Sequence, residues 1–261
     1  MTRQHNIRIQ AIALYTVIQH ELSRMFRISV QSFLPSIITT VLYFSIFGAV
    51  LGQQMQLVEG LQYSTFIAPG LVMIAVINNA YSNTSSSLFS ARFQRSIEEV
   101  LISPLRPSLM LIGYTLGGVL RALIVATLVL GVSTVFIDLS LIHIPATLGI
   151  VILIACLFSL AGFTNGMLAK TFDDVMVVPT FALSPLTYLG GVFYSISMLS
   201  PFWQHIVLLN PIFYMVELLR YAMLHHPSQH INLALIVLCL LNVGLFRLNV
   251  WLIHKGTGIR D

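Results

Sequence analysis

Charged residues are scarce in this chain of 261 residues. Asp, Glu, Lys and Arg together make up 8% of the residues, whereas hydrophobic residues make up 57%. A soluble domain contains about 25% charged residues, and its surface needs them to stay dispersed in water. The mean hydropathy of +0.89 points the same way. The composition therefore excludes a soluble globular protein and predicts an integral membrane protein.

Cysteine is also scarce, and the histidines form no metal-binding motif. Cys156 and Cys239 both lie inside apolar runs, where a thiol behaves as a small hydrophobic group. His226 and His230 are four residues apart, but Pro227 lies between them and interrupts the helix that would align them. We therefore expect neither a disulfide nor a metal site.

Lysine occurs only twice, which limits the chemistry available to the chain by itself. A phosphate-binding loop needs glycines ahead of a Lys that is followed by Ser or Thr. Lys255 precedes a glycine, and Lys170 follows the apolar residue Ala169. The chain therefore has no ATP site of this type, and ATP-driven transport would need a separate ATPase. The basic residues are spread between apolar runs, so nucleic-acid binding is not expected either.

Six apolar runs are long enough to cross a bilayer. A hydrocarbon core about 30 Å thick requires roughly 20 apolar residues in a helix, whereas a barrel would show short strands of alternating hydrophobicity. We therefore predict an all-α membrane protein whose residues 31–254 form one transmembrane domain. The first run lacks the features of a cleavable signal peptide, so we expect it to remain in the mature protein. The six runs are 31–51, 63–87, 108–137, 145–169, 175–194 and 232–254.

The basic residues indicate how the six helices are oriented. Ten of the 13 Lys and Arg residues lie in four segments on one side, and only Arg220 lies on the other. Because basic residues are retained in the cytoplasm, we predict that both termini, including the tail 255–261, are cytoplasmic. Arg247 lies near the inner end of the last run, where its side chain can reach the interface. The four basic segments are 1–30, 88–107, 170–174 and 255–261.

Residues 1–30 precede the first run and contain a helical pattern over 7–29. Apolar residues from Ile7 to Phe26 share one arc of the helix, and polar residues such as Gln19 and Arg27 lie opposite. This pattern is typical of an amphipathic helix on a membrane surface. Packing against another protein subunit is the alternative.

The first cytoplasmic loop contains a second amphipathic pattern, at about 90–104. Phe93, Ile97 and Val100 have helical spacing, and charged residues occupy the opposite face. We predict a short helix that ends before Pro104. An apolar stripe facing the cytosol is expected to be buried against another surface, and we favour a cytoplasmic partner protein. The alternative cover is the inner ends of the chain's own helices.

Residues 195–228 are too apolar for an exposed loop, yet three prolines interrupt them. We predict a segment that enters the membrane from the outer face without crossing it. Its aromatic residues suit the membrane interface. Glu217 and Arg220 are three residues apart and are expected to form an ion pair, with a substrate contact as the alternative.

Polar side chains recur at helical spacing inside the second and fifth runs, and one arginine lies deep in the third. Polar groups within a membrane face the bundle interior. They would line a substrate route or form hydrogen bonds between helices. The candidate pathway residues are Asn78, Ser82, Ser85, Ser86, Arg121, Thr180, Ser184 and Thr187.

Two pairs of glycines have the spacing that permits close helix packing. Gly113 and Gly117 lie in the third run, and Gly162 and Gly166 lie in the fourth. Small residues four apart let helix backbones approach one another in a membrane. We therefore expect tight helix contacts at both pairs.

The stretch 185–223, PLTYLGGVFYSISMLSPFWQHIVLLNPIFYMVELLRYAM, resembles the signature region of ABC type-2 transporter permeases. The loop motif FQRSIEEVLISP at 93–104 and the stretch AKTFDDV at 169–175 resemble the YadH-like branch of bacterial inner-membrane permeases. One departure is Ser200, which stands where Leu-Pro is usual and separates Leu199 from Pro201. The signature positions are filled by Pro185, Gly190, Gly191, Phe193, Pro201, Asn210, Pro211, Tyr214 and Arg220.

The resemblance covers essentially the whole chain and implies a permease subunit of an ATP-binding cassette exporter in the bacterial inner membrane. It implies two copies of this chain and two copies of a separate ATPase, which would bind ATP and Mg. This chain would itself bind no cofactor and catalyse no reaction. The implied mechanism is alternating access, and we expect an amphiphilic substrate.

The resemblance also implies roles for two segments. The helix in the first cytoplasmic loop would be the coupling helix that sits in a groove of the ATPase, with Phe93 and Ile97 as apolar anchors. Its coupling residues would be Arg92, Phe93, Arg95, Ile97, Glu98 and Glu99. Two short re-entrant helices would close the outer end of the route, with Gly190, Gly191, Pro201, Asn210, Pro211, Glu217 and Arg220 as their outer-segment residues.

Functions from other classes remain as alternatives. An ATPase-independent carrier or flippase would need buried ionisable residues in its spans, and only Arg121 qualifies. An intramembrane enzyme would need a convergent nucleophile and base or a metal triad, and the sequence contains neither pattern. A scaffolding subunit would leave the polar stripes unexplained.

Overall fold

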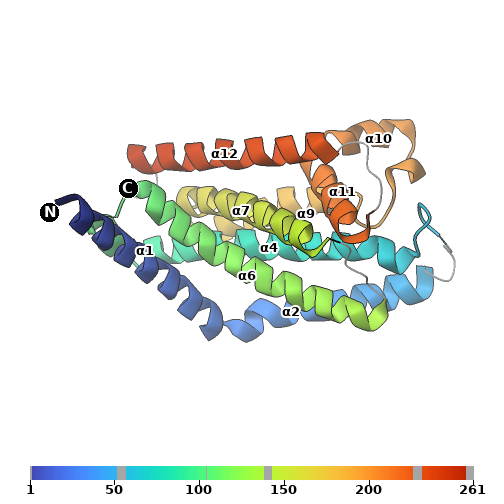
Figure 1. Cartoon of the computed structure of the whole chain (residues 1–261), viewed down its shortest axis with the longest axis horizontal. Helices are drawn as coiled ribbons and strands as arrows, with labels where there is room; N and C mark the ends of the chain where they lie inside the picture. The colour runs from blue at the N-terminus through green and yellow to red at the C-terminus, as the bar shows by residue number, and fades with distance from the viewer. Residues whose placement is uncertain (1, 52–56, 104, 138–142, 226–230, 257–261) are drawn as a thin grey trace.

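The computed structural model describes residues 2–51, 57–103, 105–137, 143–225 and 231–256. In these ranges the chain forms a bundle of helices that run mainly along one long axis (Figure 1). The elements are α1 (Thr2–Arg27), α2 (Ser29–Tyr43), η1 (Phe44–Leu51), α4 (Tyr63–Phe93), α5 (Ile97–Ile102), α6 (Pro107–Phe136), α7 (Ile144–Leu168), α8 (Phe172–Val178), η2 (Pro179–Leu183), α9 (Ser184–Tyr188), η3 (Ile196–Met198), α10 (Pro201–Leu208), α11 (Pro211–Leu224) and α12 (Ile231–Lys255).

Five helical segments are long and apolar enough to cross a membrane, and each matches a predicted run. They confirm the all-α class and five of the six predicted spans. The segments are Ser29–Gly48, Tyr63–Phe93, Pro107–Phe136, Ile144–Leu168 and Ile231–Lys255.

The predicted fifth span, 175–194, is helical only as far as Tyr188. α8, η2 and α9 follow one another without a break because the joining residues keep helical angles. At 1.5 Å per residue the combined helix is about 25 Å long. The chain then turns at Gly191, whose φ of +72° favours glycine. The predicted end at Tyr194 was therefore wrong, because the apolar composition continues through a turn.

α10 and α11 form a sharply bent pair in the segment predicted to be re-entrant. Their axes meet at 85°. Asn210 begins α11, and its side chain accepts a hydrogen bond from the backbone N–H of Ile212 at 3.0 Å. Pro211 occupies the first turn of α11, where a missing N–H costs nothing. The position of this pair relative to the membrane stays a prediction.

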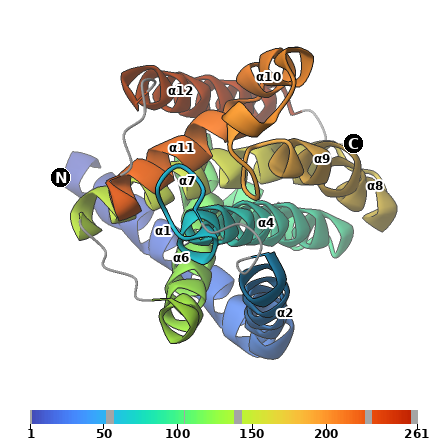
Figure 2. The ribbon, with the colours of Figure 1, turned by 90° about the vertical axis from the view of Figure 1, so that its right-hand side faces the viewer.

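α4 is the central helix of the bundle, with α6, α7 and α11 around it (Figure 2). Gly162 and Gly166 of α7 lie directly against its backbone. A Cβ at these glycines would lie 2.4 Å from the Tyr81 carbonyl oxygen and 2.6 Å from that of Ser85. The predicted close packing at this glycine pair is therefore confirmed.

The other glycine pair holds α1. A Cβ at Gly113 would lie 2.7 Å from the side chain of Val17, and a Cβ at Gly117 would lie 2.8 Å from that of Glu21. α1 therefore packs along α6, as Figure 1 shows. A helix is present where 7–29 was predicted, but it ends at Arg27 and α2 begins at Ser29. Its place on the membrane surface stays a prediction.

Gly162→Ala should weaken the bundle where α7 meets α4. The new methyl group would press on a backbone oxygen that no side-chain rotation can move, and overpacking of this kind costs about 1–3 kcal/mol. Gly149→Ala on the same helix is the control, because nothing lies within 4 Å of its Cβ position. SDS-induced unfolding of the purified protein in mixed micelles measures both variants. Equal stability of the two would contradict the proposed contact.

Candidate functional site

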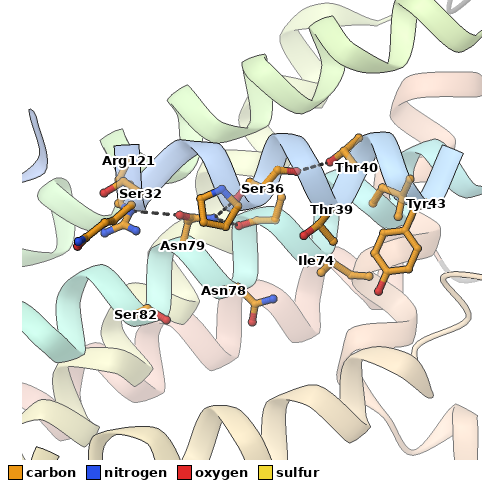
Figure 3. Close-up of a pocket in the computed structure, with 14 residues that line it drawn as sticks. Ser32, Ser36, Thr39, Thr40, Tyr43, Ile74, Asn78, Asn79, Ser82 and Arg121 are labelled. Carbon is orange, nitrogen blue, oxygen red and sulfur yellow. Dashed lines mark hydrogen bonds between the residues drawn. The ribbon is translucent and has the colours of Figure 1, made fainter. Parts of the chain in front are cut away.

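A polar cavity of about 280 Å³ lies between α2 and α4 and reaches α6. Ser36 and Thr39 of α2 and Asn78 and Ser82 of α4 line it, together with Arg121 of α6 (Figure 3). Three of these residues, Asn78, Ser82 and Arg121, are predicted pathway residues. The cavity therefore brings polar side chains from three helices together inside the membrane domain.

Arg121 is held at this cavity by two amides. Its Nε donates to Asn79 Oδ1 at 3.1 Å, and its Nη1 donates to Asn83 Oδ1 at 3.3 Å. Asn79 in turn donates to Ser36 Oγ of α2 at 3.0 Å. Arg121 has no carboxylate partner in the described part of the chain. The cavity therefore presents a positive charge that the protein orients with neutral groups.

A second polar cluster joins α1 to the same part of α4. The carboxylate of Glu21 is 1% exposed and accepts hydrogen bonds from Ser87 Oγ and, at 3.4 Å, from Arg24 Nη2. Arg24 also donates to the backbone oxygen and Oδ1 of Asn83, at 2.9 Å each. Because Asn83 contacts both Arg24 and Arg121, one amide connects the N-terminal helix to the cavity.

The remaining predicted pathway residues lie outside the cavity lining. Ser85 is buried, and Ser86 accepts a long hydrogen bond from α1. Thr187 donates to a backbone carbonyl of its own helix, while Thr180 and Ser184 are exposed. The structure therefore places Asn78, Ser82 and Arg121 at the cavity and leaves Thr180 and Ser184 exposed. Ser85, Ser86 and Thr187 lie in neither place and contact protein.

The helix predicted over about 90–104 is present only in part, because residues 90–93 continue α4 and the separate helix α5 covers Ile97–Ile102. A left-handed residue, Arg95 with φ +58°, separates it from α4. Ile97 is 3% exposed and packs in a core cluster with Met110 and Leu111. Phe93 is 67% exposed and Ile102 is 85% exposed. The predicted stripe is therefore divided, because the chain's own core buries Ile97 and partly buries Val100 but leaves Phe93 exposed.

Charged residues of this loop are divided in the same way. Nη1 of Arg92 donates to the backbone oxygens of Gly166 and Ala169 at 2.8 and 2.9 Å, so it binds the carboxyl end of α7, where a cation is favoured. Glu98 and Glu99 are exposed. Of the predicted coupling residues, Arg92 and Ile97 thus contact the chain's own bundle, and the others face outward.

A capping box begins α8 at the same end of the bundle. Thr171 Oγ1 accepts from the backbone N–H of Asp174, and the Asp174 carboxylate accepts from the backbone N–H groups of Lys170 and Thr171 at 2.9 Å each. These hydrogen bonds hold the pKa of Asp174 below its ordinary value. The cap therefore stays charged at neutral pH and weakens only as the pH falls through that lowered pKa.

At the other end of the bundle, Arg220 anchors the turn after α9. It is 2% exposed and donates to Glu217 at 2.5 Å and to the backbone oxygen of Gly191 at 3.0 Å. Its guanidinium also lies 3.9 Å from the ring centre of Phe66. The predicted Glu217–Arg220 ion pair is present, and it holds the glycine turn against α4.

The other outer-segment residues explain why the chain folds back here. A Cβ at Gly190 would lie 2.9 Å from Ile212, and Nδ2 of Asn210 donates to the Leu186 carbonyl at 2.6 Å. Both contacts fasten α11 to α9. Pro201 begins α10 directly after Ser200, so the departure at Ser200 leaves a helix start in place.

Two buried polar residues of this region, Glu21 and Asn83, were not predicted from the sequence. Glu21 is the only acidic residue before Glu59, and it lies on the same face of α1 as Val17 and Met25. That pattern is a signal for a buried carboxylate, but its partners on α4 become identifiable only when the helices are packed.

No group of three His, Cys, Asp or Glu side chains within the described ranges could hold a metal ion. His226 and His230 lie outside the described residues. Cys156 and Cys239 are free thiols, as predicted.

Arg24→Ala should destabilise the protein by about 3 kcal/mol, because it leaves the buried Glu21 carboxylate without its charged partner. Arg27→Ala is the matched control: Arg27 lies three residues further along α1 and is exposed, so its loss should stay within about 0.5 kcal/mol. SDS-induced unfolding in mixed micelles compares the two. A similar loss in both variants would show that the Glu21 cluster contributes little.

Comparison with known proteins places these features in a family. The model of the ABC-2 type transporter family matches residues 12–224. The inner membrane transport permease YadH of Escherichia coli K12 is 45% identical over 253 residues, which cover 96% of this chain and 98% of that protein. Nodulation protein J of Neorhizobium galegae is 26% identical over 234 residues, 88% of each chain. The chain therefore belongs to the ABC-2 type transporter family and is a multi-pass transport permease of the inner membrane.

Proposed function

We propose that two copies of this chain form the substrate route of an exporter, and that two copies of a separate ATPase drive it by alternating access. The family implies an ATPase partner in general. In this proposal ATP and Mg bind to that partner, and this chain binds no cofactor. The outward direction follows from the resemblance to exporters, and the termini are cytoplasmic.

The exposed surface formed by the end of α4 and by α5 carries the proposal. Phe93 and Ile102 are large apolar residues that expose 67% and 85% of their surface, and Glu98 and Glu99 lie beside them. Apolar residues surrounded by charged ones are typical of a protein interface. In the predicted orientation this surface faces the cytoplasm, where an ATPase subunit would cover it.

The inner contacts of α5 give this surface a route to the rest of the bundle. Ile97 fixes α5 in the core cluster near the start of α6, and Arg92 fastens the end of α4 to α7. A displacement of α5 would therefore be transmitted to α4 and α6, which line the polar cavity. We propose that Phe93, Arg95, Glu98 and Glu99 contact the ATPase and that Arg92 and Ile97 transmit its motion.

An exposed amide in the middle of α4 supports a route between two chains. Asn78 is exposed and has no hydrogen-bond partner among the described residues. An unsatisfied amide is costly in hydrocarbon, so we propose that Asn78 faces water or cargo between the first, second and fifth spans of two copies. Thr180 and Ser184 are exposed on the fifth segment and would line the same route.

The cavity favours an amphiphilic cargo. Its polar wall contains Arg121, whereas α2, which lines the cavity, also has the exposed apolar residues Leu34 and Ile38. Polar and apolar surfaces on one helix suit a molecule that has a polar head and an apolar part. The bent pair α10–α11 would dip in from the outer face and close the outer end of the route.

Co-purification tests the assembly. The chain is expressed with the ATPase encoded beside it, and the complex is isolated in lipid nanodiscs. We expect two copies of each subunit and ATP hydrolysis. If the chain purifies alone, the coupling role of α5 is wrong, and an ATPase-independent carrier or flippase becomes the better function.

The double variant Phe93→Ala with Glu98→Ala should insert normally but lose its ATPase. Because hot-spot residues at interfaces contribute 2 kcal/mol or more, we expect at least tenfold less co-purified ATPase. Phe202→Ala on α10 is the control, since Phe202 is 68% exposed at the opposite end of the bundle. Full ATPase recovery with the double variant would contradict the proposed docking surface.

Asn78→Cys should react with a hydrophilic maleimide in the assembled complex, because this position faces an aqueous route. The variant is made after replacement of Cys156 and Cys239. Leu240→Cys is the control: it is 66% exposed in the middle of α12 and should face lipid. We expect at least tenfold faster labelling at position 78, with a rate that changes when ATP is added. Equal slow labelling at both positions would contradict a route beside α4.

A further inference from the structure

A second hollow lies on the other side of the bundle from the polar cavity. It is an apolar groove of about 470 Å³ between α6, α7 and α12. Its walls include Leu116 of α6, Leu160 of α7, and Val243 and Phe246 of α12, and Arg247 lies at its edge. α12 and α2 occupy opposite sides of the bundle in both views (Figures 1 and 2). The groove is therefore separate from the proposed cargo route.

Two side-chain amides of α12 bind it to α7 beside the groove. Nδ2 of Asn242 donates to the Leu153 carbonyl at 3.1 Å, and Nδ2 of Asn249 donates to the Leu160 carbonyl at 3.0 Å. Both bonds join α12 to α7. Because α12 is fastened to α7 on each side of Val243 and Phe246, it cannot close onto α6 without breaking them. The groove is therefore built into the packing of the three helices.

Arg247 lacks a protein partner for its charge. It is exposed and forms no ion pair or hydrogen bond within the described ranges, and α6, α7 and α12 contain no Asp or Glu. It lies eight residues before Lys255, the last residue of α12, and thus about 12 Å inside the end of the helix. An arginine at that depth pairs with an anion or extends to the interface.

We propose that an anionic phospholipid of the cytoplasmic leaflet occupies this groove, with its phosphate on Arg247 and one acyl chain between α6 and α12. The leaflet follows from the orientation, because Arg247 lies near the end of α12 that carries Lys255. Basic pockets between transmembrane helices on the cytoplasmic side bind anionic head groups, and the apolar walls suit an acyl chain. The lipid would fill the space between α6 and α12 beside the two amides.

Native mass spectrometry of the full chain, titrated with phosphatidylglycerol or phosphatidylcholine in detergent, tests this proposal. A basic residue contributes about 1 kcal/mol toward anionic lipid, so Arg247→Gln should bind phosphatidylglycerol about fivefold more weakly. Lys255→Gln is the matched control, because Lys255 lies over the Trp251 ring at the helix end, and it should keep wild-type binding. Val243→Trp fills the groove while it retains the charge, and it should lose the bound lipid.

Several results would contradict the proposed lipid site. Equal weakening by Arg247→Gln and Lys255→Gln would indicate general surface charge, and equal binding of phosphatidylcholine would remove the role of the anion. If Val243→Trp changed the dimer fraction but kept the lipid, a second copy of the chain would occupy the groove. The chain alone is sufficient for this experiment, so its outcome is independent of whether the ATPase co-purifies. Thermal unfolding in the same detergent confirms that each variant is folded.

Discussion

The contact between the backbones of α4 and its neighbours is the constraint on which the rest of the bundle depends. Gly162 and Gly166 bring α7 against carbonyl oxygens of α4. Gly118 brings α6 close to the Thr84 hydroxyl of α4 and the Ser159 hydroxyl of α7. In a membrane such contacts replace the hydrophobic effect as the source of helix association. They leave α4 almost wholly surrounded by protein.

Burial of α4 explains why its polar residues are organised as they are. An amide buried among helices needs partners, and Asn79 and Asn83 find theirs in Ser36, Arg24 and Arg121. These bonds connect α1, α2 and α6 through one helix. The carboxyl end of the same helix is followed, after a short turn, by α5. A conformational change at α5 therefore has a continuous physical connection to the cavity.

The bundle also shows where sequence patterns stop being informative. Hydropathy located five spans because each is one uninterrupted apolar helix. It placed the end of the fifth at Tyr194, whereas the helix ends at Tyr188, because the turn that follows is as apolar as the helix. The amphipathic pattern over about 90–104 predicted one helix with Phe93 and Ile97 on one surface. The structure divides it between the end of α4 and α5, and the left-handed residue between them lets the bundle cover Ile97 while Phe93 stays exposed.

The sequence by itself determined the membrane class, the long helices and the family motifs, because these depend on composition and on residues close together in the chain. Tertiary structure alone decided that Glu21 is buried, that Asn83 joins α1 to Arg121, and that Arg247 lines an apolar groove with no partner among the described residues. Each of these depends on the packing of helices far apart in the sequence. No local pattern contains that information, because the same polar residue is satisfied or unpaired according to its neighbour across the helix interface.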